Sequence, residues 1–299
     1  MKKVLVIGSL NIDFSVSVDK IPYPGETVNA NSLLINNGGK GANQAYTIGK
    51  LGGNVSMLGC IGKDEYGKQL KNDLAKVGVV VDGIYEHPSV DSGKAFINVS
   101  KDGENAITIV HGANYEVDED FIMNNISYIE DADIILMQLE IPLSTVKKVL
   151  EVAKDKTIIL DPAPASDEIM SFDLSNIYLM KPNETEIETL TKVKVTDEES
   201  AAVAASKLLE KGVKNVLVSL GKNGSYLINS LGTKYFPCIS SNVVDTTAAG
   251  DSFIASVALG LSKDSTLDES ILFASKVASI VVTKKGAQSS IPTLEEVLE

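Results

Sequence analysis

The chain has 299 residues and a formal net charge of −13 at pH 7, and its 27 basic residues are all lysine. With 44% apolar and 22% charged residues, it can bury a large core, which excludes a disordered chain. The acidic balance argues against nucleic acid or an anionic membrane surface as a partner. Because arginine is absent, an anionic ligand must be held by lysines, backbone N–H groups or a bound cation.

The N-terminal apolar run and the two cysteines predict a cytoplasmic protein. The apolar run Val4–Ile7 stops at Gly8 and Ser9, which favours a buried strand over a signal peptide, and no stretch is long enough to span a membrane. Cys60 and Cys238 lie far apart without metal-ligand spacing, so we expect two buried free thiols.

Short β-branched runs then alternate with amphipathic helical patterns. The predicted strands are Val4–Ile7, Val55–Leu58, Ile134–Met137, Thr157–Leu160, Ile177–Met180 and Val216–Ser219, and the predicted helices are Gly41–Leu51, Tyr66–Val77, Ser144–Ala153 and Asp197–Lys211. Near-continuous apolar strands between such helices predict an α/β fold with a mainly parallel central sheet flanked by helices on both faces.

Two segments, about 14–36 and 93–110, break this rhythm because apolar and polar residues alternate in them. The turn at 101–104 predicts a hairpin within the second segment. One-sided strands inserted into an α/β chain predict a small β-sheet lid, whose other face would cover a ligand or a second subunit. We see no linker, so residues 1–299 are expected to form a single domain that carries this lid.

Several common sites are absent. The chain contains no G-x-x-x-x-G-K-[ST] loop, no G-x-S-x-G elbow and no complete G-x-G-x-x-G after a strand, and the protein-kinase catalytic loop requires an arginine. His87 and His111 are remote from the glycine-rich segments, so we expect structural roles for them rather than a catalytic triad or a zinc site.

The first informative segment is Asn37–Ala45, which contains three glycines and opens a helix. Glycine allows close approach of the backbone to a ligand, Lys40 adds a charge, and a helix start offers free N–H groups. A tight strand-to-helix turn is the alternative. The polar side chains of Asn43 and Gln44, where an apolar face should begin, favour a binding site.

The second is Asp245–Phe253, where the small residues 248–250 expose successive N–H groups at a helix start. An N-capped helix is the plain alternative. However, Asp245 already caps the turn, and the carboxylate of Asp251 inside an anion site repels the ligand unless it is catalytic. An oxyanion cradle beside one carboxylate is suited to phosphoryl transfer.

At these two segments the sequence resembles the PfkB family of carbohydrate kinases, and especially its ribose-phosphorylating members. Gly38–Ala45 and Asp245–Phe253 match the two family signatures. The likeness continues in order through 8–13, 137–140, 161–165, 182–186 and 285–288, and so covers essentially the whole chain. The resemblance implies a ribokinase-like α/β fold.

The resemblance also implies roles for individual residues. The sugar would be held by Asn11, Ile12, Asp13, Gly39, Lys40, Gly41, Ala42, Asn43 and Glu140. Asp251 would be the general base, and the N–H groups of Ala248, Ala249, Gly250 and Asp251 would stabilise the transferred phosphoryl group. Asn183 and Glu186 would organise Mg²⁺ and its waters near the phosphates of ATP. The remaining nucleotide contacts would come from Gly250, Asp251 and the turn Ser219, Leu220, Gly221, Lys222, Asn223 and Gly224.

Family members of this type also bind an activating monovalent cation, K⁺. The matching positions are Asp245, Thr247, Val281, Lys284, Gly286 and Ser290, mostly through backbone carbonyl oxygens, and only Asp245 has a side chain that independently suggests a hard-cation ligand. One departure from the family pattern is Ser275, where a histidine often lies against the adenine. Nucleotide affinity or base preference is therefore expected to differ.

The leading functional hypothesis is transfer of phosphate from ATP to O5 of D-ribose. The resemblance places the Asn11 amide near the 2-hydroxyl, which argues against 2-deoxyribose as the substrate. Another pentose or hexose remains the nearest alternative, and adenosine is less favoured because the lid has few aromatic residues. A non-catalytic sugar or nucleotide sensor would not need Asp251 and its cradle. Packing of two lids predicts a homodimer.

Overall fold

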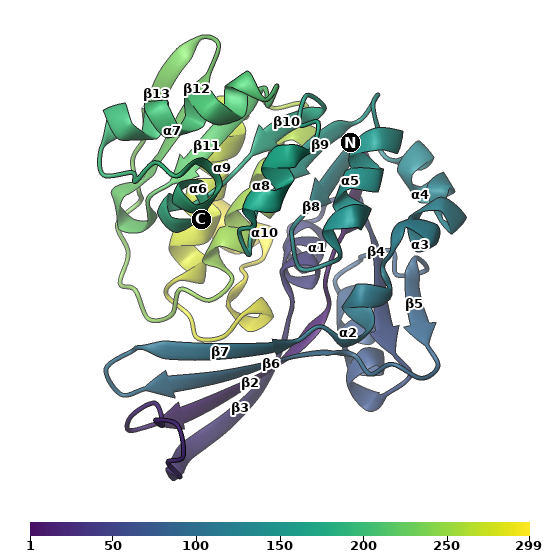
Figure 1. Ribbon diagram of the computed structural model, residues 1–299, viewed down its shortest axis with the longest axis vertical. Helices are drawn as coiled ribbons and strands as arrows, with labels where there is room; N and C mark the ends of the chain where they lie inside the picture. Colours follow the sequence, from purple (N-terminus) through teal and green to yellow (C-terminus); the bar gives the residue numbers. More distant parts are fainter.

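The computed structural model describes all 299 residues and contains two β-sheets. The main sheet has nine strands in the order β13-β12-β11-β10-β9-β8-β1-β4-β5 (Figure 1). Their bounds are β1 Val4–Ile7, β4 Val55–Gly62, β5 Ile84–His87, β8 Ile134–Met137, β9 Thr157–Leu160, β10 Ile177–Met180, β11 Asn215–Ser219, β12 Ser225–Asn229 and β13 Gly232–Phe236. All pairs from β5 to β11 are parallel, and the pairs β11–β12 and β12–β13 at one edge are antiparallel, so only β12 runs opposite to the other strands.

Helices cover both faces of this sheet, as predicted. The apolar side chains of strand β1 show why. Leu5 and Ile7 belong to one cluster of 34 buried residues, whereas Val4 and Val6 belong to another of 33. The first cluster is covered by α3 Glu119–Asn124, α4 Ile126–Asp131, α5 Leu143–Val152, α6 Glu184–Thr191 and α7 Glu198–Glu210. The second is covered by α1 Lys40–Lys50, α2 Glu65–Lys76, α8 Ala249–Ser262, α9 Leu267–Val281 and α10 Leu294–Leu298.

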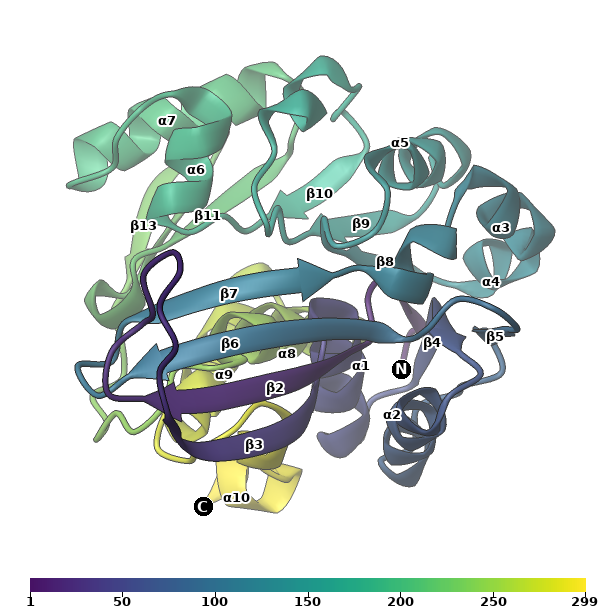
Figure 2. The ribbon, with the colours of Figure 1, turned by 60° about the horizontal axis from the view of Figure 1, so that its bottom comes forward.

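The smaller sheet is the lid. Its strands are β2 Asn11–Val18, β3 Ala30–Gly38, β6 Gly93–Ser100 and β7 Asn105–Val110, in the order β3-β2-β6-β7. It projects from one side of the main body (Figure 1), and Figure 2 shows its four strands side by side. The hairpin predicted at 101–104 joins β6 to β7, and the central pair β2–β6 is parallel.

The predicted elements agree closely with the structure. The six strands were placed correctly, although β4 continues to Gly62 and β11 begins one residue earlier, and all four helices lie within one residue of the prediction at each end. The lid strands extend further than predicted, because β2 already pairs at Asn11 with Gly38 and Gly93. No helix is both long enough and apolar enough to cross a bilayer.

The prediction of two buried thiols is correct for Cys60 and wrong for Cys238. Cys60 lies on β4 in the core, where burial raises the pKa of its thiol to about 12. Cys238 is exposed, because the chain leaves the edge strand β13 at Phe236 and no element covers the following residues.

Candidate active site

Five of the segments predicted to form the site follow the carboxyl ends of neighbouring parallel strands, and two others begin the helices α1 and α8. Ser9 to Asp13 follow β1, Gln138 to Glu140 follow β8, Asp161 follows β9, Asn183 follows β10, and the turn 219–224 follows β11. Because these strands are adjacent in the order β11-β10-β9-β8-β1, the segments form one row along the same edge of the sheet. In α/β sheets this edge is where ligands bind.

The glycine-rich segment opens α1 by packing backbone against backbone. Gly39 has a φ of +85°, and a Cβ on Gly41 would lie 2.7 Å from the backbone of Gly8 and Ser9, so only glycine fits. The N–H groups of this helix start are not free, contrary to the prediction. The Lys40 N–H donates to the carboxylate of Glu140 at 3.0 Å, and the Ala42 N–H donates to the Ser9 carbonyl at 2.8 Å. The segment therefore offers side chains to a ligand rather than N–H groups.

Two carboxyl groups lie beside this helix start. Glu140 accepts hydrogen bonds from the Ser9 hydroxyl and the Lys40 N–H, which fixes its side chain. The carboxyl group of Asp13 lies against Gly38, where a Cβ would be 2.1 Å from its nearest oxygen, and it accepts no hydrogen bond from the protein. Burial is the main cause that raises the pKa of Asp13 to about 7, and the negative charges of Glu140 and Asp251 add to this effect. Asp13 is thus free to bind a hydroxyl group.

The second signature begins α8 and has the predicted open N-terminus. Ala248 adopts a left-handed conformation with a φ of 60°. The N–H of Ala249 donates to the Thr246 carbonyl at 3.2 Å, so it is not available as predicted, whereas those of Ala248, Gly250 and Asp251 donate to no protein atom. Three unpaired N–H groups at the positive end of a 14-residue helix can bind an anion, so this helix start is the candidate anion site.

Asp251 is 6% exposed and is held by side chains from the first signature. The Asn43 amide donates to its Oδ2 at 2.9 Å, and the Lys40 ammonium lies 3.8 Å from its Oδ1. Gln288 donates to the other end of the Asn43 amide at 3.4 Å, which orients it. Burial alone would lower the pKa of Lys40, but the charges of Asp251, Asp161 and Glu140 outweigh this and raise it, so Lys40 is a permanent cation.

Sequence reasoning gave no role to Lys181, which is 4% exposed at the end of β10. Its ammonium lies 3.4 Å from Asp161 Oδ1 and 3.4 Å from where a Cβ on Gly250 would be. It therefore places a second positive charge at the α8 anion site. Burial raises the pKa of Asp161 to about 6, against the opposing charges of Lys181 and Lys40. A lysine directly before the Pro182-Asn183 motif was the available signal.

Asn183 and Glu186 form a capping box at the start of α6, since each side chain accepts from the other's backbone N–H at 2.8 Å. Only one carboxylate oxygen of Glu186 is used in this way. The remaining oxygen fits Mg²⁺, which proteins typically hold through one or two carboxylates together with phosphates and water. Asn183 also forms a bridge with Ser219, which joins the nucleotide turn to this motif. Ser275 lies on α9, where its hydroxyl donates to the Ile271 carbonyl at 2.9 Å.

The predicted monovalent-cation segments meet around Asp245. Its carboxylate accepts from the Thr247 hydroxyl at 2.6 Å and from the N–H groups of Thr247 and Gly286, both at 2.9 Å. Partial burial alone would raise the pKa of Asp245, but these bonds, the hydroxyl bond first, outweigh it and lower the pKa. The carboxylate therefore ties the two loops together. The backbone carbonyls of Thr247, Lys284 and Gly286 accept no hydrogen bond, which fits a K⁺ site built from carbonyl oxygens. Val281 does not fit equally well, since its carbonyl accepts from the Lys284 N–H at 3.2 Å.

The two histidines make local contacts within the protein. His87 accepts from the N–H groups of Ser89 and Val90, and His111 stacks on Tyr115 with the ring centroids 4.0 Å apart.

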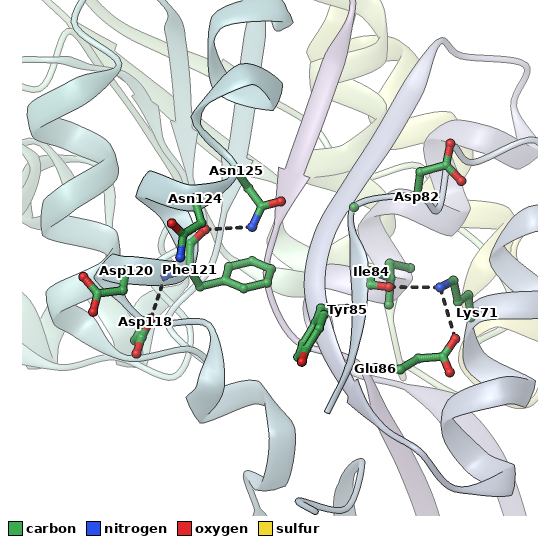
Figure 3. Close-up of a pocket in the computed structure, with 11 residues that line it drawn as sticks. Lys71, Asp82, Ile84, Tyr85, Glu86, Asp118, Asp120, Phe121, Asn124 and Asn125 are labelled. Atoms are coloured by element: carbon green, nitrogen blue, oxygen red, sulfur yellow. Dashed lines mark hydrogen bonds and ion pairs between the residues drawn. The ribbon is translucent and has the colours of Figure 1, made fainter. Parts of the chain in front are cut away.

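A groove of about 700 Å³ lies between β5 and α3, lined by residues such as Tyr85, Phe121 and Lys71 (Figure 3). It contains none of the predicted site residues, and the row of polar groups at the strand ends is the chemically equipped region.

Comparison with known proteins shows the family. The family described as pfkB family carbohydrate kinase matches residues 1–294. This chain belongs to that family. A ribokinase of Haemophilus influenzae is 41% identical, over all of this chain and 98% of that protein. A deoxyribokinase of Salmonella typhi is 33% identical, over 98% of this chain and 96% of that protein. The structure of Arabidopsis thaliana ribokinase complexed with ribose and ATP superposes with a TM-score of 0.91, at 33% identity, over 99% of this chain and 97% of that one. The ribokinase-like fold and the carbohydrate-kinase assignment are thereby confirmed.

Proposed function

We propose that this protein transfers the terminal phosphoryl group of ATP to O5 of D-ribose. The observation that carries the proposal is the arrangement around Asp251. A buried carboxylate, oriented by Asn43, lies at the start of a helix with three unpaired N–H groups, and Lys40 and Lys181 lie beside it. This combination deprotonates a hydroxyl group and stabilises a phosphoryl group in the same place.

In the proposed reaction, Asp251 accepts the proton of the sugar hydroxyl as that oxygen attacks the γ-phosphorus. The bond to the β-phosphate oxygen breaks and ADP leaves. The N–H groups of Ala248, Gly250 and Asp251 bind the equatorial oxygens of the transferred group. Lys181, which lies next to Gly250, adds a positive charge. Asn11, Asp13, Lys40 and Glu140 hold the sugar. Mg²⁺, held near Glu186 and Asn183, would neutralise charge on the phosphates, and K⁺ near the Thr247 and Gly286 carbonyls would strengthen the field at the anion site.

The test is a sugar panel with Mg²⁺, K⁺ and ATP, in which ADP formation is the readout. D-Ribose should be the best substrate, and 2-deoxy-D-ribose should have a lower kcat/KM, because the site would lose a partner for a polar group. The similarity to a deoxyribokinase makes 2-deoxyribose the second candidate. Absence of turnover with every pentose contradicts the proposal. A better rate with 2-deoxyribose assigns the activity to that sugar instead.

We also propose that the protein forms a homodimer through its lid. Apolar side chains are exposed on both faces of the lid. The strand register puts Leu34 of β3 and Ile107 of β7, which are 58% and 54% exposed, on one face, and Leu33, Ile35 and Phe96, which are 54%, 45% and 42% exposed, on the other. A second lid packed on the face of Leu34 and Ile107 would cover these two side chains. Sedimentation of the wild type and of Leu34→Lys should give a dimer and a monomer, respectively, and a monomeric wild type contradicts the proposal.

A further inference from the structure

Asn114 lies outside every predicted motif but is joined to the sugar-binding strand. It belongs to the 3₁₀ turn Gly112–Glu116 that follows lid strand β7, and it is 1% exposed. Its Oδ1 accepts from the Leu10 N–H at 2.8 Å, and its Nδ2 donates to the Leu10 carbonyl at 3.3 Å. Because the backbone N–H can only donate and the carbonyl can only accept, this pair of bonds fixes which way round the Asn114 amide lies.

The fixed amide in turn orients Asn11. The Asn114 Nδ2 also donates to Asn11 Oδ1 at 2.7 Å. The oxygen of the Asn11 amide is therefore turned toward Asn114, and its Nδ2 is on the opposite branch, where it donates to no protein atom. Gly93 makes this contact possible, since a Cβ there would lie 2.1 Å from Asn11 Oδ1 and 2.3 Å from Asn114 Nδ2.

We propose that Asn114 is a positioning residue that determines sugar specificity by holding Asn11 as a hydrogen-bond donor. This inference rests on the proposed function, in which Asn11 contacts the sugar. A free amide could rotate and present either its oxygen or its nitrogen to a hydroxyl group. With Asn114 in place, only the nitrogen is presented, so the site selects a sugar that carries an acceptor at that position.

Fluorinated sugars test the direction of this hydrogen bond, because a C–F group accepts weakly and cannot donate. The measured quantity is the ratio of kcat/KM for the 2-fluoro-2-deoxy analogue of D-ribose to that for 2-deoxy-D-ribose. A second ratio compares the 3-fluoro-3-deoxy analogue with 3-deoxy-D-ribose in the same way. In the wild type, one position should favour the fluoro analogue over the deoxy analogue. In Asn114→Asp, the new carboxylate accepts from Asn11 Nδ2 and turns the Asn11 oxygen toward the sugar. The ratio should then fall several-fold, with about tenfold as the upper limit because C–F is a weak acceptor.

Because both sugars are measured in one sample, partial misfolding cancels in the ratio. Asn114→Ser should weaken the preference without reversing it, and Asn11→Asp, in which Asn114 still donates to one oxygen, should reproduce the effect of Asn114→Asp. The proposal is overturned if the wild type has no fluoro preference at either position, or if Asn114→Asp lowers both rates and leaves the ratio unchanged, as a purely structural residue would. Failure of the proposed function is a different result, since the wild type would then not phosphorylate D-ribose.

Discussion

Replacement of Asp251 by asparagine tests the chemistry with little change in shape. The Asn43 amide donates to Asp251 Oδ2 at 2.9 Å, and an introduced amide can satisfy that bond only through its oxygen. Its NH₂ group then occupies the place of Oδ1, 3.8 Å from the Lys40 ammonium. An NH₂ group cannot accept a proton, so Asp251→Asn retains the packing and loses the base.

The size of the effect follows from the role of the residue. General base catalysis contributes ~10²–10⁴-fold, which corresponds to roughly 3–5 kcal/mol of transition-state stabilisation at 1.36 kcal/mol per factor of ten. We expect kcat to fall within this range. The sugar and phosphate contacts of Asn11, Glu140 and the α8 N–H groups remain, so the dissociation constant for D-ribose should change much less than kcat.

The assay measures ADP formation at saturating D-ribose, together with calorimetric titration of D-ribose. Asp264→Asn is the matched control, because Asp264 is an exposed acid in an ion pair with Lys2, and its activity should equal that of the wild type. A kcat for Asp251→Asn within threefold of the wild type, with sugar binding intact, would refute the assignment of Asp251 as the base.

Three further outcomes are expected. Because the folded-state pKa of Asp13 is raised to about 7, its contribution to stability is present below its unfolded pKa and is lost as the pH rises through 7. Asp13→Asn should therefore be more resistant to urea than the wild type at pH 8, with the difference disappearing by pH 4, and an equal difference at both values contradicts this. Lys181→Met should lower kcat/KM for ATP by at least ~10-fold while D-ribose affinity is retained, since a hydrogen bond to a charged group is worth ~1.5–3 kcal/mol. Lys211→Met is the control, because Lys211 is exposed at the end of α7 and lies outside every predicted site, and it should leave kcat/KM unchanged. Replacement of K⁺ by Na⁺ should lower the rate, and an unchanged rate removes the proposed cation site.

The sequence by itself predicted six of the nine strands of the main sheet, the lid segments and most of the candidate site. The predicted strands of the main sheet, such as Val4–Ile7 or Ile134–Met137, are buried on both faces, so a continuous apolar run identifies them without any partner. The open helix start at 248–251 was also readable, because small residues before an apolar helix leave a local signature. These features depend only on residues that are neighbours in the chain.

The tertiary structure decided which of the two glycine-rich helix starts is open. At α1 the Lys40 and Ala42 N–H groups are occupied by Glu140 and Ser9, which lie 100 and 33 residues away in the chain, whereas at α8 no such partner arrives. Lys181 beside Gly250 and Asn114 beside Asn11 were hidden for the same reason. A contact between residues so far apart has no periodicity that a single sequence could reveal, and it forms only when the complete chain folds.

At the carboxyl ends of the parallel strands, an acidic chain without arginine gathers the positive charge that a polyphosphate requires. The sequence restricted the sources of positive potential to lysines, N–H groups and bound ions. The fold selected Lys40 and Lys181 from the 27 lysines by placing them beside Asp251 and Gly250. Charge is most effective where water is excluded, and packing of the complete chain buries Lys181 and leaves the Lys40 side chain only 30% exposed.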